Sequence, residues 1–146
     1  MNNIIFKGVL NMKEEEIVNK VEKYVKKETM NESSGHDWWH IKRVYNLAIK
    51  INEKEKADKF IIQMIALLHD MFDKKFSTGD IRENLLNLLE KLNLIEFIDD
   101  KKIENIVFSI EHLSFNGGFS SVKISREGEI VQDADRIDAT GAIRNS

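Results

Sequence analysis

Hydrophobic residues recur along most of the chain at intervals of three and four, the spacing that gathers them on one face of an α-helix. Polar or glycine-rich stretches interrupt this pattern. The chain contains no proline, whose ring would break a helix. The sequence therefore predicts an all-α bundle of about six helices, at roughly residues 13–28, 37–52, 58–69, 80–92, 99–113 and 130–143.

The segment from Asp58 to His69 differs from the other predicted helices because it is apolar almost all round. A helix of this kind is expected at the centre of the bundle, covered by the others. Residues 1–11 have no clear place in the pattern, and we expect them to form a disordered or non-native extension. Asp80 is expected to cap the helix that follows it. Five of the seven glycines are expected between helices: Gly35, Gly79, Gly117, Gly118 and Gly128.

Composition narrows the class of protein. A chain of 146 residues fits one domain of ordinary size, and a hydrophobic content of 42% is enough for a core. A formal net charge of −3 argues against dedicated nucleic-acid binding. The absence of cysteine excludes a disulfide scaffold, a zinc finger and a thiol nucleophile. No apolar run approaches the ~20 residues of a membrane span, and no signal-peptide layout is present, so we expect a cytoplasmic protein.

Two of the four histidines are the strongest candidates for chemistry. His69 ends the apolar helix and is followed at once by Asp70. An imidazole and a carboxylate at the end of such a helix are costly to bury unless something neutralises them, and a divalent cation would do so. His40, near the start of the second predicted helix, would be another ligand. The segment VQDADRID offers a further carboxylate, from Asp133, Asp135 or Asp138.

Taken singly, these residues also have ordinary explanations. His40 would serve as a half-buried helix residue, and Asp70 as a helix-end or turn residue. The dipeptide His-Asp occurs twice, at His36–Asp37 and at His69–Asp70, so it is a weak signal alone. Spacing therefore leaves open both the metal site and the choice among the three aspartates.

Three motifs in a fixed order resemble the HD-domain metal-dependent phosphohydrolases. They read HDWWHIKRVYNLAIKI, ALLHDMFDKKF and IVQDADRIDATGAI, and the likeness spans residues 35–143. It is strongest to the small bacterial members with an HDxxHxxRV opening. The three motifs together are far more specific than any one of them.

The resemblance implies a set of metal ligands. His40 is preferred to His36 because the family's first ligand precedes a valine by four residues, as His40 precedes Val44. Asp135 is preferred to Asp133 because the family motif reads A-D-R followed by Leu or Ile. One divalent cation, such as Mn, Fe or Mg, would then be held by His40, His69, Asp70 and Asp135.

The resemblance also implies hydrolysis of a phosphate ester or anhydride in a small substrate, with a nucleotide expected. The metal would polarise the phosphorus centre and lower the pKa of bound water, so no serine or cysteine nucleophile is needed. Asp73 is expected to orient the attacking water or take its proton, and Asp70 is the other catalytic residue. Expected to bind substrate are His36, Arg43, Lys75, His112 and Arg136.

Several of these residues have alternative explanations. Asp73 would also suit an exposed turn, and His112 a helix end. The guanidinium groups of Arg43 and Arg136 suit phosphate, but either would also pair with a carboxylate. The two tryptophans are expected to pack rather than to stack on a base: Trp38 and Trp39.

Members of the family continue after the GAI segment, whereas this chain ends at Ser146. We therefore expect a single HD domain over residues 1–146 that lacks the family's C-terminal helices. Apolar surface left by those helices would favour a homodimer. Two further functions stay open: a catalytically idle HD module that binds metal or nucleotide, and a structural bundle without metal.

Overall fold

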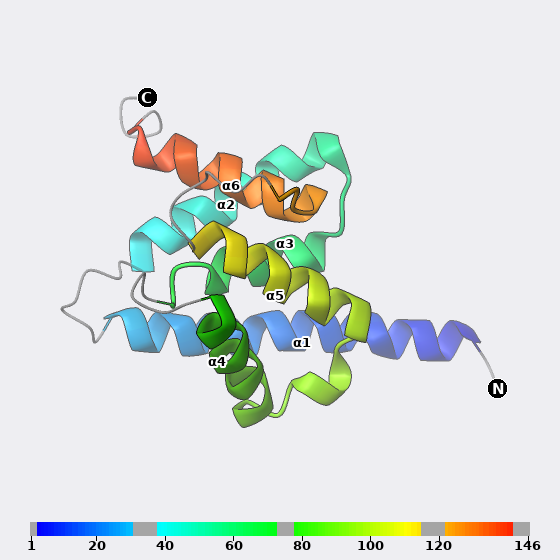
Figure 1. The fold of residues 1–146 in the computed structure, drawn as a ribbon. Helices are drawn as coiled ribbons and strands as arrows, with labels where there is room; N and C mark the ends of the chain where they lie inside the picture. Colours follow the sequence, from blue (N-terminus) through cyan, green and yellow to red (C-terminus); the bar gives the residue numbers. More distant parts are fainter. Residues whose placement is uncertain (1–2, 31–37, 73–77, 115–121, 142–146) are drawn as a thin grey trace.

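The computed structural model of the protein describes residues 3–30, 38–72, 78–114 and 122–141. Within these ranges there are six α-helices, one short 3₁₀ helix and no β-strand, so the all-α prediction is confirmed. Figure 1 shows their arrangement. The elements are α1 (Asn3–Met30), α2 (Trp38–Glu55), α3 (Lys59–Leu68), α4 (Thr78–Lys91), η1 (Ile95–Phe97), α5 (Asp100–Ser114) and α6 (Arg126–Ala139).

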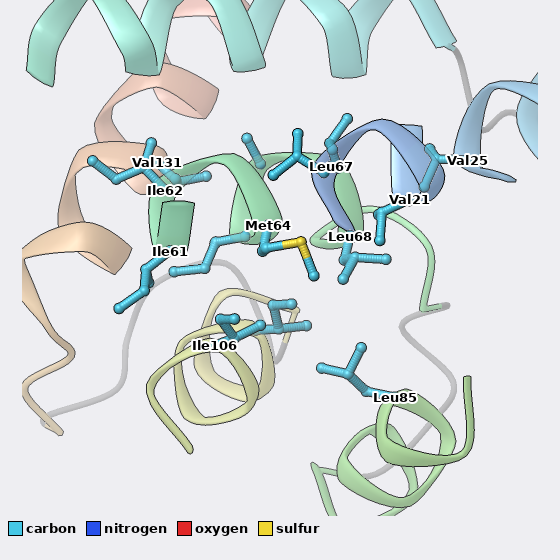
Figure 2. Close-up of a cluster of buried hydrophobic side chains, with 14 of the residues drawn as sticks. Val21, Val25, Ile61, Ile62, Met64, Leu67, Leu68, Leu85, Ile106 and Val131 are labelled. Carbon is cyan, nitrogen blue, oxygen red and sulfur yellow. The ribbon is translucent and has the colours of Figure 1, made fainter. Parts of the chain in front are cut away.

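The central position predicted for the third helix is confirmed. α3 packs against α1, α2, α5 and α6. Its N-cap is Asp58, whose carboxylate accepts a hydrogen bond of 3.2 Å from the amide of Ile61. Figure 2 shows its side chains enclosed by residues of α1, α4, α5 and α6. Six of the seven side chains from residue 62 to residue 68 are fully buried: Ile62, Met64, Ile65, Ala66, Leu67 and Leu68.

Three helices begin earlier than predicted, and α1 and α4 are two of them. α1 begins at Asn3, so residues 3–11, expected as an extension, belong to this helix. α4 begins at Thr78, which places Asp80 in its first turn rather than at the N-cap. An aspartate in the first turn still suits the helix dipole, because its negative charge faces the positive end.

The last helix is displaced toward the N-terminus relative to the prediction of 130–143. α6 begins at Arg126 because Ser125 is its N-cap, with its hydroxyl accepting a hydrogen bond of 3.0 Å from the Gly128 amide. It ends at Ala139, two residues before Gly141, whose φ of 76° is the left-handed conformation common after helices. α6 runs alongside α2 and also packs on α3 (Figure 1).

Gly128 lies inside α6, not between helices as expected, and it approaches Ser109 of α5 closely. A Cβ at this position would lie 2.7 Å from Oγ of Ser109 and 3.1 Å from Cδ1 of Ile124. We expect Gly128→Ala to lower the free energy of unfolding by about 1–2 kcal/mol despite the better helix propensity of alanine. Urea denaturation measures this loss. Adding Ser109→Ala should restore part of it, and a Gly128→Ala variant as stable as wild type would contradict the steric explanation.

Candidate metal centre

The candidate site lies where α2, the end of α3 and α6 meet. His40 is in the first turn of α2, and His69 is the C-cap of α3. The backbone amide of His69 still donates to the Ile65 carbonyl at 2.8 Å, which holds the residue in register with the buried helix. Asp135 and Asp138 lie on α6 one turn apart, on the same face of the helix. Packing of α6 against α2 and α3 therefore brings two carboxylates to two imidazoles.

Asp135 links the two histidines. Its Oδ1 lies 3.0 Å from Nε2 of His40 and 3.5 Å from Nε2 of His69. One ligand atom from each of the three residues falls within 4.8 Å of the others, as in a group that could hold a metal ion. The His69 side chain is 6% exposed and the Asp135 side chain 40% exposed. The group thus has a buried side and a side open to solvent.

The other ring nitrogen of each histidine faces an acceptor in the protein. Nδ1 of His69 donates to the Ala66 carbonyl at 2.8 Å, and Nδ1 of His40 donates to Oδ2 of Asp138 at 2.5 Å. Since a carbonyl and a carboxylate can only accept, both protons are fixed on Nδ1. In the neutral imidazole this leaves the Nε2 lone pair directed at the shared group, which is the tautomer that a metal ligand needs.

Without a cation, the charges at the site compensate one another. The hydrogen bond to Asp135 raises the pKa of His40 to about 9, against the opposing effect of burial. Burial alone would lower the pKa of His69, but Asp135, Asp70 and the Ala66 carbonyl outweigh it and the pKa is raised. Burial would raise the pKa of Asp135, but the hydrogen bond from His40 and the nearby charge of His69 hold it well below its usual range. A bound cation would replace the protons on the two Nε2 atoms.

Asp138 is the most buried carboxylate of the site, with 3% of its side chain exposed. Besides His40 it binds Arg43, whose Nε donates to Oδ1 at 2.8 Å and whose terminal nitrogen donates to Oδ2 at 3.3 Å. Burial would raise its pKa, but Arg43 and His40 lower it, so the group stays ionised. Asp138 therefore joins α6 to the first two turns of α2.

The structure brings together three of the four predicted ligands. Asp70, the fourth, lies in the turn after α3, partly exposed, and its charge raises the pKa of both His40 and His69. The role of all four as ligands stays a prediction. Asp133, the rejected alternative, is exposed on another side of α6.

Of the remaining predicted site residues, three lie in the part of the chain that the structure describes and three lie outside it. Arg136 is exposed on α6, and the ring of His112 packs against Phe108 with 4.3 Å between ring centroids. Arg43 pairs with a carboxylate, the alternative considered for it from the sequence. His36, Asp73 and Lys75 lie outside the described residues.

Sequence reasoning offered Asp138 only as an alternative ligand and missed its contacts with His40 and Arg43. A signal was present, because His40 and Arg43 are three residues apart, as are Asp135 and Asp138. Two such pairs on facing helices predict a four-residue cluster if the helices pack together.

The HD domain family model matches residues 38–140. The chain belongs to the HD domain family. The match covers α2 through α6 and contains His40, His69, Asp135 and Asp138. The resemblance found in the three sequence motifs is therefore confirmed.

This HD domain has bacterial relatives of known structure. It is 37% identical over 134 residues to the uncharacterized protein YpgQ of Bacillus subtilis, covering 90% of this chain and 64% of YpgQ. An HD-superfamily hydrolase from Bacillus thuringiensis matches with a TM-score of 0.68 and 35% identity, over 89% of this chain and 61% of that one. The structure of B. subtilis YpgQ in complex with ADP matches with a TM-score of 0.66 and 33% identity, over 87% and 60%. The chain thus spans less than two thirds of the length of these relatives.

None of the helices in the described ranges combines the length and the apolar character that a membrane span requires.

The pair formed by His40 and Asp135 makes stability depend on pH. The folded pKa of His40 is about 9, above the ordinary value of 6.5, so its contribution is complete below pH 6.5 and lost as the pH rises through 9. Between pH 6.5 and 9.5, we expect chelator-treated wild-type protein to lose on the order of 2 kcal/mol more unfolding free energy than His40→Gln. Urea denaturation at several pH values measures the difference, and parallel curves for the two proteins would refute it.

Proposed function

We propose that this HD domain is a metal-dependent phosphohydrolase that acts on a nucleotide or another small phosphate ester or anhydride. The observation that carries the proposal is the convergence of His40, His69 and Asp135 within 4.8 Å, at the position of the family's motifs. Similarity to an HD-superfamily hydrolase supports the reaction class. Similarity to YpgQ, a protein whose structure holds ADP, supports a nucleotide as substrate.

The donor set fits a divalent cation of the borderline kind. Two imidazole nitrogens with Asp135, and Asp70 beside them, suit Mn, Fe or Zn, and the carboxylates also suit Mg. A cation bound there supplies Lewis-acid polarisation of a phosphoryl oxygen and a water of lowered pKa. Asp138 and the Ala66 carbonyl keep both histidines in the tautomer that leaves Nε2 for binding. The open side of the site, at Asp135, is where substrate would enter.

The remaining roles follow the chemistry of hydrolysis. Oxygen of water bonds to phosphorus, the bond from phosphorus to the leaving oxygen breaks, and the proton of water passes to a base. We propose Asp73 as that base, with Lys75 and Arg136 balancing the phosphate charge. Arg43 would contribute its charge while Asp138 holds its guanidinium group.

The test is release of phosphate and pyrophosphate from a panel of nucleotides, with Mn, Fe, Mg, Zn and Co added in turn. Hydrolysis of at least one nucleotide that requires one of these metals supports the proposal. Stoichiometric metal binding without any hydrolysis would indicate the second candidate, a catalytically idle metal- or nucleotide-binding module. The absence of metal binding would contradict the proposed hydrolysis, and the absence of both metal and nucleotide binding would contradict the second candidate as well.

A further inference from the structure

A second group of side chains with ligand-binding character lies between α1 and α2. A groove of about 380 Å³ opens there, where the end of α1 and the start of α2 lie on the same side of the molecule (Figure 1). This volume falls in the range of small-molecule sites. Its lining shares no residue with the metal group: Asn19, Glu22, Lys23, Lys26, Trp38, Trp39 and Lys42.

The groove faces away from the metal group. Successive residues of an α-helix are turned by about 100°, so the side chains of Trp38 and Lys42 leave α2 about 160° from that of His40. Trp38 is 4% exposed and belongs to the core, as predicted. Trp39 is 58% exposed, so the prediction that it packs inside the protein is wrong. An exposed indole at the edge of a groove offers a flat face for stacking.

The charge of the groove is positive, although the whole chain carries −3. Three lysines and one glutamate line it, and the glutamate is engaged because Glu22 accepts a hydrogen bond of 2.8 Å from Lys42. In the part of the chain that the structure describes, no carboxylate pairs with Lys23 or Lys26. Nζ of Lys26 lies 6.0 Å from the centre of the Trp38 ring. Ammonium groups beside an aromatic ring suit a ligand with both an anionic group and a planar ring.

We propose that this groove is a second binding site, separate from the metal centre, for a mononucleotide. Its ring stacks on Trp39, and its phosphates lie against Lys23 and Lys26. A long nucleic acid is disfavoured because it would extend beyond the groove over an acidic molecule. The proposal does not depend on catalysis, since the groove shares no residue with the metal group.

The test is calorimetric titration of ADP into chelator-treated protein. We expect ADP to bind more tightly than adenosine or inorganic phosphate, because each of those offers only half of the contacts. Trp39→Leu should weaken binding about tenfold, as expected for a lost stacking platform. Lys23→Ala combined with Lys26→Ala should weaken it at least tenfold, whereas Lys50→Ala, an exposed lysine outside the groove, should not change it.

A metal-site variant separates this proposal from the proposed hydrolysis. Asp135→Asn should bind ADP as tightly as wild type in the presence of chelator, whatever its activity. In Trp38→Phe, which leaves Trp39 as the remaining tryptophan, ADP should quench the fluorescence. The proposal is overturned if ADP does not bind at millimolar concentration, or if Asp135→Asn abolishes binding. Unchanged ADP affinity in Trp39→Leu and in the double variant of Lys23 and Lys26 would also overturn it. So would a single-stranded oligonucleotide that binds more tightly than ADP.

Discussion

Asp135→Ala should greatly weaken metal binding and abolish any metal-dependent hydrolysis, whereas Asp133→Ala should leave both intact. Oδ1 of Asp135 approaches Nε2 of both histidines, so its loss removes the shared anion of the cluster. We expect metal affinity to fall on the order of a hundredfold or more, and the metal-induced rise in melting temperature to disappear. Metal content after dialysis and melting curves with and without added metal measure the effect.

Asp133 is the matched control because it is an exposed aspartate on the same helix, two residues away. Each variant removes one carboxylate, so the two variants have the same net charge. Equal loss of metal in the two variants, or metal retained by Asp135→Ala and lost by Asp133→Ala, would show that the wrong carboxylate had been chosen.

Asp138→Ala should weaken metal binding about 10- to 100-fold although Asp138 is not a proposed ligand. It removes the acceptor that fixes the proton of His40 on Nδ1, at 2.5 Å, and the partner of Arg43. We also expect the free energy of unfolding to fall by about 2 kcal/mol. This is less than for a fully buried ion pair because Arg43 is 38% exposed. Calorimetric metal titration and urea denaturation measure the two losses.

Two variants separate the orientation of His40 from a merely structural effect. Asp138→Asn keeps an oxygen that accepts from His40, so it should recover most of the metal affinity but not the stability. Arg43→Gln breaks the ion pair and leaves the hydrogen bond to His40, so it should lose stability while keeping metal affinity within a few-fold of wild type. If metal affinity followed stability across all three variants, Asp138 would not act by orienting His40.

Helices whose apolar residues recur periodically were predicted well from the sequence. Helix ends that are set by a capping residue were predicted poorly. The apolar run from Phe60 to Leu68 could only be a central helix, because each of its faces needs cover. The start of α6 was missed because the cap at Ser125 precedes the first periodic residue by five positions. The exposure of Trp39 could not be predicted either, since neighbouring tryptophans give no sign of which one faces the core.

The candidate site was predicted residue by residue only with the aid of motif order. Spacing alone left three aspartates equivalent, and packing of α6 distinguishes them: Asp135 meets both histidines, Asp138 holds His40 and Arg43, and Asp133 is exposed. Contacts between residues almost a hundred positions apart depend on how helices pack, which no local pattern specifies. The roles of His36, Asp73 and Lys75 remain predictions.

The position of α6 has a consequence for synthesis of the protein. His69 is synthesised 66 residues before Asp135. Its imidazole therefore lacks this carboxylate partner while α4, α5 and most of α6 are synthesised. At typical translation rates of about 5–20 residues per second, this interval lasts on the order of 3–13 s. During it, the face of α3 that α6 later covers, including Ile62, is open to solvent and to other nascent chains. Because α6 carries Asp135 and also packs on this face, the packing that completes the histidine–aspartate cluster also covers the most apolar of the described helices.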